Sequence, residues 1–248
     1  MIISDSSVLL TGASGGIGCA LVRALSRRGA HLVVSSRDLS KLDDAASDVR
    51  AAGRFVAADL TDENQVRRLA EEAGEIDVLI NNAGVGWYGN AAQMPCTDVR
   101  RLVEINMLAP LLLTRLLLPG MTTRKRGHIV FVGSVAGHLG VENEAVYSAT
   151  KAALRTYAEA LRAEVRRQGI GGSVVSPGAV ATKFFEHRGA AYQRSWPPAI
   201  PADAVAAAVI HAVERSDNQV FVPHWLRVPA LLHDGLPAIY RGFANKFG

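Results

Sequence analysis

Short continuous apolar segments alternate with longer amphipathic segments along most of the chain. The short segments are rich in Val, Ile and Leu on consecutive positions, which is typical of strands that are covered on both faces. We predict seven such strands, at residues 8–10, 31–35, 55–58, 78–80, 128–132, 172–176 and 220–222. Strands of this kind belong to a parallel sheet that is buried between helices.

The longer segments between the strands have the apolar spacing of amphipathic helices. They are predicted at residues 17–28, 39–52, 63–73, 97–124, 144–168 and 202–214. Residues typical of helix starts precede several of these helices. Asp38 and Ser40 lie at the start of the second predicted helix, Thr61 and Asp62 precede the third, and Pro201 precedes the last. This alternation predicts a parallel sheet with helices on both faces. Residues 1–248 are therefore predicted to form one doubly wound, Rossmann-like α/β domain.

Two segments depart from this alternation. Residues 183–201 mix aromatic and charged residues with glycine and proline, and a connection this long in a compact domain is more often functional than idle. We predict a substrate-binding loop region there. Residues 223–248 form a C-terminal tail with no clear period. Packing on the body or in a subunit interface is the favoured interpretation of the tail, and a lid or a membrane-surface contact is the alternative.

The composition is that of an ordinary globular protein, with 49% apolar and 20% charged residues among 248. It excludes a disordered chain and a disulfide-rich miniprotein. The net charge of +4 is small and the basic residues are scattered, so no nucleic-acid partner is expected. The chain has two cysteines, Cys19 and Cys96, and its first residues lack the pattern of a secretory leader, so we expect a cytoplasmic location.

Other segments are predicted to be structural. The most apolar long stretch, residues 103–119, includes charged residues and is expected to be a buried helix rather than a membrane span. The histidines show no metal-ligand spacing, so no metal is expected. His138 and His187 lie in predicted loops that could border the substrate, but a surface position is the favoured interpretation. Trp87 and Tyr88 fit either a pocket lining or packing between loops.

A glycine-rich turn, TGASGGIG at residues 11–18, follows the first predicted strand and opens the first predicted helix. Gly12, Gly16 and Gly18 let the backbone turn sharply and approach a pyrophosphate, while the helix start supplies free N–H groups. Ser14 and Ile17 lie in the same turn and are assigned to the same site. The place of the turn between strand and helix predicts dinucleotide binding.

The end of the second predicted strand indicates which dinucleotide is bound. An acidic residue there would bind the ribose 2′-hydroxyl of NAD, but this chain has Ser35, Ser36 and Arg37. A guanidinium suits a 2′-phosphate, to which it can donate two charge-assisted hydrogen bonds. Arg37 therefore favours NADP(H) over NAD(H), with an ordinary surface arginine as the alternative interpretation.

The motifs, taken in order, resemble those of the short-chain dehydrogenase/reductase family over residues 5 to about 222. The resemblance rests on TGASGGIG at 11–18, NNAG at 81–84, Asn106, Ser134, YSATK at 147–151 and PGAVAT at 177–182. It implies seven parallel strands in the order 3-2-1-4-5-6-7. It also implies a homodimer or homotetramer that pairs through the helices at 97–124 and 144–168.

Tyr147 and Lys151 are four residues apart on a predicted helix, so their side chains share a face. We expect the Lys151 cation to lower the pKa of Tyr147 from about 10 toward the working range, so that Tyr147 acts as the acid and base. The resemblance implies that Ser134 binds the substrate oxygen. It further implies that Asn106 fixes a water in a proton relay and that Lys151 holds the nicotinamide ribose.

The resemblance also assigns cofactor contacts in the turns after the predicted strands. Asp59 would accept a hydrogen bond from the adenine amino group, although it also fits a cap for the helix that begins near Thr61. Thr182 would bind the carboxamide of the nicotinamide. The remaining contacts would come from Leu60, Asn82, Ala83, Gly84, Pro177 and Gly178.

These residues together predict an NADP(H)-dependent oxidoreductase that interconverts a carbonyl and an alcohol in a small-molecule substrate. The alternative is a regulatory or redox-sensing protein that binds NADP(H) without turnover. Aromatic residues in the 183–201 region favour an apolar or bulky substrate; they are Phe184, Phe185, Tyr192 and Trp196.

Overall fold

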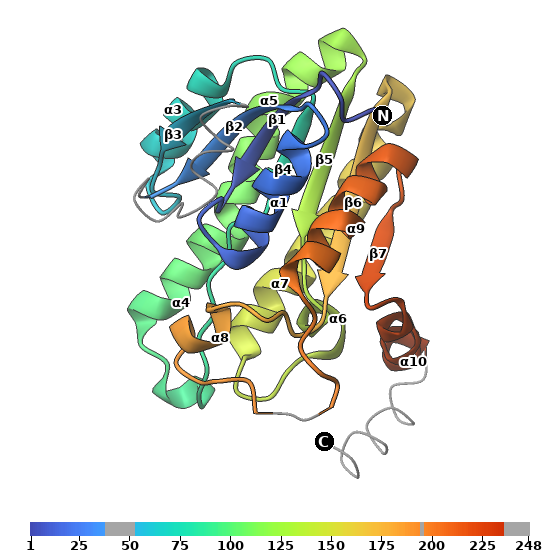
Figure 1. Ribbon diagram of the computed structural model, residues 1–248. Helices are drawn as coiled ribbons and strands as arrows, with labels where there is room; N and C mark the ends of the chain where they lie inside the picture. The colour runs from blue at the N-terminus through green and yellow to red at the C-terminus, as the bar shows by residue number, and fades with distance from the viewer. Residues whose placement is uncertain (38–52, 194–195, 236–248) are drawn as a thin grey trace.

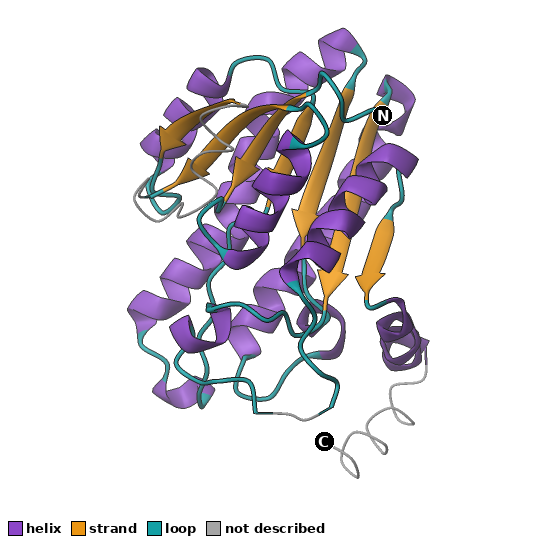
Figure 2. Cartoon of the chain, in the orientation of Figure 1, coloured by secondary structure: helices purple, strands orange, loops and turns teal. Residues whose placement is uncertain are grey.

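The computed structural model describes residues 1–37, 53–193 and 196–235. Seven parallel strands form one sheet in the order β3-β2-β1-β4-β5-β6-β7, which confirms the predicted strands and their implied order (Figures 1 and 2). The strands are β1 Ser7–Thr11, β2 His31–Ser36, β3 Gly53–Ala57, β4 Val78–Asn81, β5 Gly127–Val132, β6 Ile170–Pro177 and β7 Gln219–Val222. The reversal of strand order beside β1 is the place where α/β sheets bind ligands.

Helices cover both faces of the sheet, as the alternating pattern predicts (Figure 2). Helices α1 (Gly16–Ser26) and α9 (Ala202–Arg215) share one core with the sheet. Helices α3 (Glu63–Ala73), α5 (Ala109–Arg124) and α7 (Ala145–Val165) share the core on the other face. Short helices lie at the ends of these layers: η2 Ala91–Gln93, α6 Ala136–Leu139, η4 Arg166–Gln168, α8 Phe184–His187, η5 His224–Leu226 and α10 Arg227–Gly235.

The predicted helix at 97–124 is a continuous helical stretch with a local change of pitch. It consists of α4 (Cys96–Val103), a π-helical turn η3 (Glu104–Leu108) and α5. By length and composition it could cross a membrane, with a mean hydropathy of 1.5. It packs on the sheet, however, and its buried side chains there include Leu113 and Met121. A π-turn inside an α-helix often marks a functional position, and this one contains Asn106.

The structure confirms only some of the residues that were predicted to cap helix starts. Asp62 caps α3 as predicted, because its carboxylate accepts hydrogen bonds from the backbone N–H groups of Asn64 and Gln65. Pro201 precedes α9 in an extended conformation and makes no side-chain cap. The predicted helix at 39–52 and its caps Asp38 and Ser40 lie outside the described residues.

A buried histidine joins two central strands at the end of the sheet remote from the glycine turn. His128 Nε2 lies 2.8 Å from the hydroxyl of Ser173, which donates to the carbonyl oxygen of Asp217. Burial lowers the pKa of His128 from 6.5 to about 4. The folded state therefore holds this imidazole neutral over a range in which the unfolded chain binds a proton.

We expect His128 to make the protein less stable as the pH is lowered. Its folded pKa lies below the unfolded value, so the free energy of unfolding drops as pH falls from about 6.5 to about 4, by roughly 3 kcal/mol in total. Urea unfolding of wild type and His128→Gln at several pH values measures this drop, which the variant should lack. The exposed His31 provides the control variant His31→Gln, which should keep the wild-type slope. An unchanged slope in His128→Gln would contradict the assignment.

Candidate active site

The sequence motifs meet at the carboxyl ends of the strands. In Figure 1 the strand arrows point toward the end of the molecule that holds the loops, α6, α8 and α10. The glycine turn follows β1, Asn82 follows β4, Ser134 lies beyond β5 and Pro177 ends β6. Motifs up to 170 residues apart in the sequence are thus neighbours, because parallel strands end at one edge of the sheet.

The glycine turn is packed too closely for side chains. Gly12 has a φ of +68°, and a Cβ there would lie 2.7 Å from the Cα of Ala83. A Cβ on Gly16 would lie 2.4 Å from Thr182 Cγ2, and one on Gly18 would lie 2.1 Å from the carbonyl oxygen of Gly12. The glycines therefore let three motifs approach one another at the start of α1, and the cradle they form fits a pyrophosphate.

Asn82 and Thr11 lock this turn onto β4. The Asn82 side-chain amide donates to the carbonyl oxygens of Thr11 and Gly12, at 2.9 and 3.1 Å. The Thr11 hydroxyl accepts from the backbone N–H groups of Asn82 and Ala83, both at 3.1 Å. The NNAG motif thus holds the glycine turn in place through its first residues.

The residues predicted around the adenosine lie at the ends of β2 and β3. The Ser36 hydroxyl donates to Ser14 at 3.0 Å, which ties the glycine turn to the end of β2, and Arg37 follows as an exposed residue. Asp59 Oδ1 accepts from the N–H and the hydroxyl of Thr61, at 3.0 and 2.9 Å. Asp59 therefore caps the turn before α3, which is the structural interpretation that the sequence left open.

Tyr147 and Ser134 form the centre of the site. Tyr147 lies in the first turn of α7, is buried and hydrogen-bonds to the hydroxyl of Ser134. The Ser134 oxygen also accepts from the N–H of Ala136 at 3.1 Å. The ring of Phe184 in α8 packs against Tyr147, with centroids 5.5 Å apart. A substrate oxygen that approaches this pair meets two hydroxyl groups fixed by separate elements.

The pKa of Tyr147 is not shifted in the direction predicted. The ammonium group of Lys151 is buried, donates to the carbonyl oxygen of Val132 at 2.9 Å and lies 5.8 Å from the centroid of the Tyr147 ring. Burial lowers the pKa of Lys151 to about 8 and raises that of Tyr147 to about 12. The expectation of a lowered tyrosine pKa is wrong for this structure, because desolvation of the buried phenolate is the largest effect on that pKa.

Asn106 acts on the backbone of the neighbouring loop. Its carbonyl oxygen accepts from Val85 N–H at 2.8 Å, and its amide donates to the Val85 carbonyl oxygen at 2.9 Å. The amide also lies 3.2 Å from the hydroxyl of Thr150 on α7. The fully buried side chain therefore joins the NNAG loop to the Tyr147 helix. Through these bonds Asn106 fixes the position of both segments beside the site.

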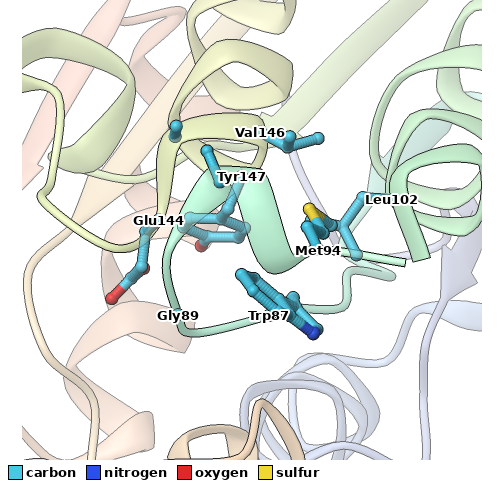
Figure 3. Close-up of a pocket in the computed structure, with 9 residues that line it drawn as sticks. Trp87, Gly89, Met94, Leu102, Glu144, Val146 and Tyr147 are labelled. Atoms are coloured by element: carbon cyan, nitrogen blue, oxygen red, sulfur yellow. The ribbon is translucent and has the colours of Figure 1, made fainter. Parts of the chain in front are cut away.

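An apolar pocket lies beside Tyr147 (Figure 3). The indole of Trp87 lines the pocket near the tyrosine ring and also packs against the loop at Gly89, so both interpretations of Trp87 hold. Met94 and Leu102 lie on one side and Glu144 on the other. No sequence pattern indicated Met94, Leu102 or Glu144, because they belong to different segments and match no motif.

A buried ion pair closes the pocket on the Glu144 side. Arg188 pairs with Glu144, and their side chains are 6% and 9% exposed. The guanidinium also lies over the rings of Tyr88 and Phe185, 4.8 and 4.6 Å from their centroids. The N–H of Tyr88 donates to the Arg188 carbonyl oxygen at 3.0 Å. The predicted 183–201 region is thus anchored at the start of the Tyr147 helix.

His138 is not the surface residue that was expected. It is buried in α6, with Nε2 3.1 Å from the hydroxyl of Ser176 and its ring against Phe221. His187 is exposed, as predicted. Within the described ranges, no three His, Cys, Asp or Glu side chains gather as metal ligands.

Comparison with known proteins gives relatives of stated activity. The ketoacyl reductase HetN of Nostoc sp. is 41% identical over 186 residues, a match that covers 72% of this chain and 65% of HetN. An uncharacterised oxidoreductase of Myxococcus xanthus is 34% identical over 243 residues, covering 95% of this chain and 94% of the relative. The similarity therefore extends beyond the motifs into the tail.

Solved structures match over nearly the whole chain. A short-chain dehydrogenase from Sphingobium yanoikuyae in complex with NADPH is 29% identical with a TM-score of 0.83, covering 97% of this chain and 95% of that one. A short-chain dehydrogenase/reductase from Burkholderia phymatum in complex with NAD is 25% identical with a TM-score of 0.84, covering 94% and 95%. The short-chain dehydrogenase family model matches residues 6–193. With its parallel sheet, close-packed glycine turn and buried Ser134–Tyr147 pair, the chain belongs to the short-chain dehydrogenase/reductase family of oxidoreductases, which act on CH–OH and C=O groups with NAD(P).

Proposed function

We propose that the protein is an NADP(H)-dependent oxidoreductase that interconverts a carbonyl and an alcohol, with Tyr147 as the acid and base. The observation that carries the proposal is the buried hydrogen bond between Tyr147 and Ser134 at the edge of an apolar pocket. Two hydroxyl groups in this position can hold one substrate oxygen, and one of them can exchange a proton with it.

The nicotinamide ring, when bound, supplies or accepts the hydride. Tyr147 is protonated at neutral pH because burial raises its pKa to about 12, so it can donate a proton to the oxygen of a carbonyl substrate. Ser134 binds the same oxygen and stabilises the charge that develops there. Lys151, with its pKa lowered to about 8, loses and regains a proton more readily than an exposed lysine and can reprotonate the site.

The residues at the strand ends fit a dinucleotide. The start of α1 and the close-packed glycines would hold the pyrophosphate, and Thr182 beside Gly16 would lie near the carboxamide. Arg37, exposed at the end of β2 beside the Ser14–Ser36 bond, would bind a 2′-phosphate. These contacts support NADP(H), because no carboxylate stands at residues 35–37.

Arg37→Ala is expected to weaken NADPH binding by roughly 10- to 100-fold, because a charge-assisted hydrogen bond contributes about 1.5–3 kcal/mol. NADH, which lacks the 2′-phosphate, should bind the variant about as well as it binds wild type. Fluorescence titration with each cofactor measures both constants.

Arg27, at the other end of α1, supplies a matched control. Arg27→Ala should bind NADPH like wild type. An Arg37→Ala protein with unchanged preference for NADPH would refute the assignment of Arg37 and reopen the choice between NADP and NAD.

The side chains beside Tyr147 support an apolar substrate. Trp87, Met94 and Leu102 line the small pocket there, and Phe184 packs against the Tyr147 ring. We further assign the protein to the cytoplasm, since Cys19 and Cys96 form no disulfide, and to a homo-oligomer that pairs through α4, α5 and α7.

A panel of apolar ketones and alcohols tests the reaction, with NADPH consumption or formation as the readout. Turnover of bulky apolar ketones that requires NADPH would support the proposal. Tight NADPH binding without turnover of any carbonyl or alcohol would instead favour the regulatory alternative.

A further inference from the structure

Thr150 lies between two residues of the proposed mechanism on α7, after Tyr147 and directly before Lys151. It is 3% exposed. Its hydroxyl donates to the carbonyl oxygen of Tyr147 at 2.7 Å and accepts from the side-chain amide of Asn106 at 3.2 Å. One buried hydroxyl group therefore joins the first turn of α7 to the π-helical turn η3.

The bond to Asn106 distinguishes this hydroxyl from that of an ordinary helical threonine. A threonine in a helix often donates to a carbonyl oxygen one turn earlier, so the bond to Tyr147 alone would be purely local. Asn106, by contrast, is 44 residues away in the sequence and lies on another element. A hydroxyl that donates along its own helix keeps its lone pairs available for a donor from elsewhere. Thr150 uses both capacities and so bridges two elements.

The bridge completes the hydrogen bonding of the buried Asn106 side chain. The carboxamide oxygen accepts from the N–H of Val85 at 2.8 Å, and the amide donates to the carbonyl oxygen of Val85 at 2.9 Å. An asparagine amide has two hydrogens, and the second is the one that Thr150 accepts. Because Asn106 is fully buried, loss of this acceptor would leave a desolvated N–H group and weaken the hold on the carboxamide.

The Asn106 carboxamide and the Lys151 ammonium meet beside the NNAG loop. A Cβ on Gly84 would lie 3.4 Å from Lys151 Nζ and 3.5 Å from Asn106 Oδ1, so the backbone of this loop lies against both groups. The ammonium is itself held by the carbonyl oxygen of Val132 at 2.9 Å. A turned carboxamide would therefore change the surroundings of the loop and of Lys151 together.

We propose that Thr150 is a positioning residue, whose hydroxyl fixes the Asn106 carboxamide and the backbone of Tyr147 and thereby holds the tyrosine hydroxyl in place beside Ser134. The role rests on the proposed oxidoreductase function. An acid must lie within hydrogen-bond reach of the substrate oxygen, and a displacement of about 1 Å can lower a rate roughly 100-fold. Thr150 acts only through its two partners and has no assigned contact with substrate.

Two variants separate the hydroxyl of Thr150 from its bulk. Thr150→Val keeps the shape and removes the hydroxyl, whereas Thr150→Ser keeps the hydroxyl and removes a methyl group. We expect Thr150→Val to lower kcat for ketone reduction by roughly 10- to 100-fold, with KM and the NADPH dissociation constant within about twofold of wild type. Thr150→Ser should stay within about twofold in kcat. A residue that only filled space would give the reverse order, because Thr150→Ser creates the cavity.

The kinetic constants are expressed per NADPH-binding site, so that misfolded protein is not counted. Thr114→Val is the matched control, because Thr114 is a fully buried threonine on α5 outside the residues of the site. It removes an equivalent hydroxyl and should keep the wild-type kcat.

Hydrogen exchange at the amide of Val85 measures the bridge without turnover. This N–H donates to Asn106 Oδ1, so its exchange rate reports how firmly the carboxamide is held. Thr150→Val should speed the exchange by roughly two- to tenfold, the range expected for the loss of one net hydrogen bond. Thr150→Ser and Thr114→Val should exchange like wild type.

Three results would each overturn the inference: full kcat in Thr150→Val, a greater loss in Thr150→Ser than in Thr150→Val, or unchanged exchange at Val85 in Thr150→Val. If wild type reduced no carbonyl, the oxidoreductase proposal would fail. The exchange rates would then decide by themselves whether Thr150 fixes Asn106.

Discussion

Replacement of Tyr147 by phenylalanine is expected to lower kcat for ketone reduction by roughly 100- to 10,000-fold, the usual contribution of a positioned acid or base. The hydroxyl is the group that bonds Ser134, and the change removes only this oxygen from a buried ring. NADPH affinity should stay within about twofold, because the proposed role of the hydroxyl is toward substrate. Steady-state rates and an NADPH titration measure both quantities.

The control for this variant lies on the same helix. Tyr157 is half-buried and packs edge-on against Phe131 in the core that α7 shares with the sheet, away from the site. Tyr157→Phe therefore removes an equivalent hydroxyl without touching the site and should keep nearly full activity. Wild-type turnover in Tyr147→Phe would refute the proton-transfer role.

The pH dependence of wild type gives a second measure of the same role. Because burial raises the pKa of Tyr147 to about 12, its acid form predominates throughout the neutral range. Loss of the Tyr147 proton should therefore not limit ketone reduction between pH 6 and 8. Alcohol oxidation needs the deprotonated form of Tyr147. Below the pKa, the fraction of this form increases about tenfold for each unit of pH, so the rate of alcohol oxidation should rise with pH.

Removal of the Arg188 guanidinium is expected to cost about 3–5 kcal/mol of unfolding free energy, because it leaves the Glu144 carboxylate buried without its partner. Arg188→Met keeps much of the apolar length of the side chain. Urea unfolding at neutral pH gives the difference from wild type. Adding Glu144→Gln to this variant should recover part of the loss, since the unpaired charge is then gone.

An exposed pair provides the comparison for this prediction. Arg67 pairs with Glu63 one turn earlier on α3, and both side chains are about half exposed. Arg67→Met should cost less than about 0.5 kcal/mol. If Arg188→Met lowered the free energy of unfolding as little as Arg67→Met does, the result would contradict the assignment of the Arg188–Glu144 pair as the anchor of the 183–201 region at the start of α7.

Several features could be predicted from the sequence because local spacing carries them. A run of apolar residues marks a buried strand, and Gly12 is needed wherever the chain turns at positive φ against another backbone. The four-residue spacing of Tyr147 and Lys151 places them on one helix face without knowledge of the rest of the fold. The predicted site residues are therefore neighbours in the structure chiefly because parallel strands bring their motifs to one edge.

The tail shows the limit of pattern alone. Its apolar residues after Val222 have no evident period until the η5–α10 segment fixes which of them face inward. Leu226 and Ala230 are buried, whereas Val228 and Leu231 are exposed, and hydrophobicity does not distinguish the two pairs. Only packing against α6 and β7 decides between them.

Sequence motifs were enough to predict the strand order, the glycine cradle and the group of Ser134, Tyr147 and Lys151. The burial that raises the pKa of Tyr147 depends on the tertiary structure. The tertiary structure also decided the attachment of Asn106 to Val85. The reason is physical: conformational preference and motif spacing act over a few residues, whereas desolvation and ion pairing depend on groups that meet only when distant segments pack together.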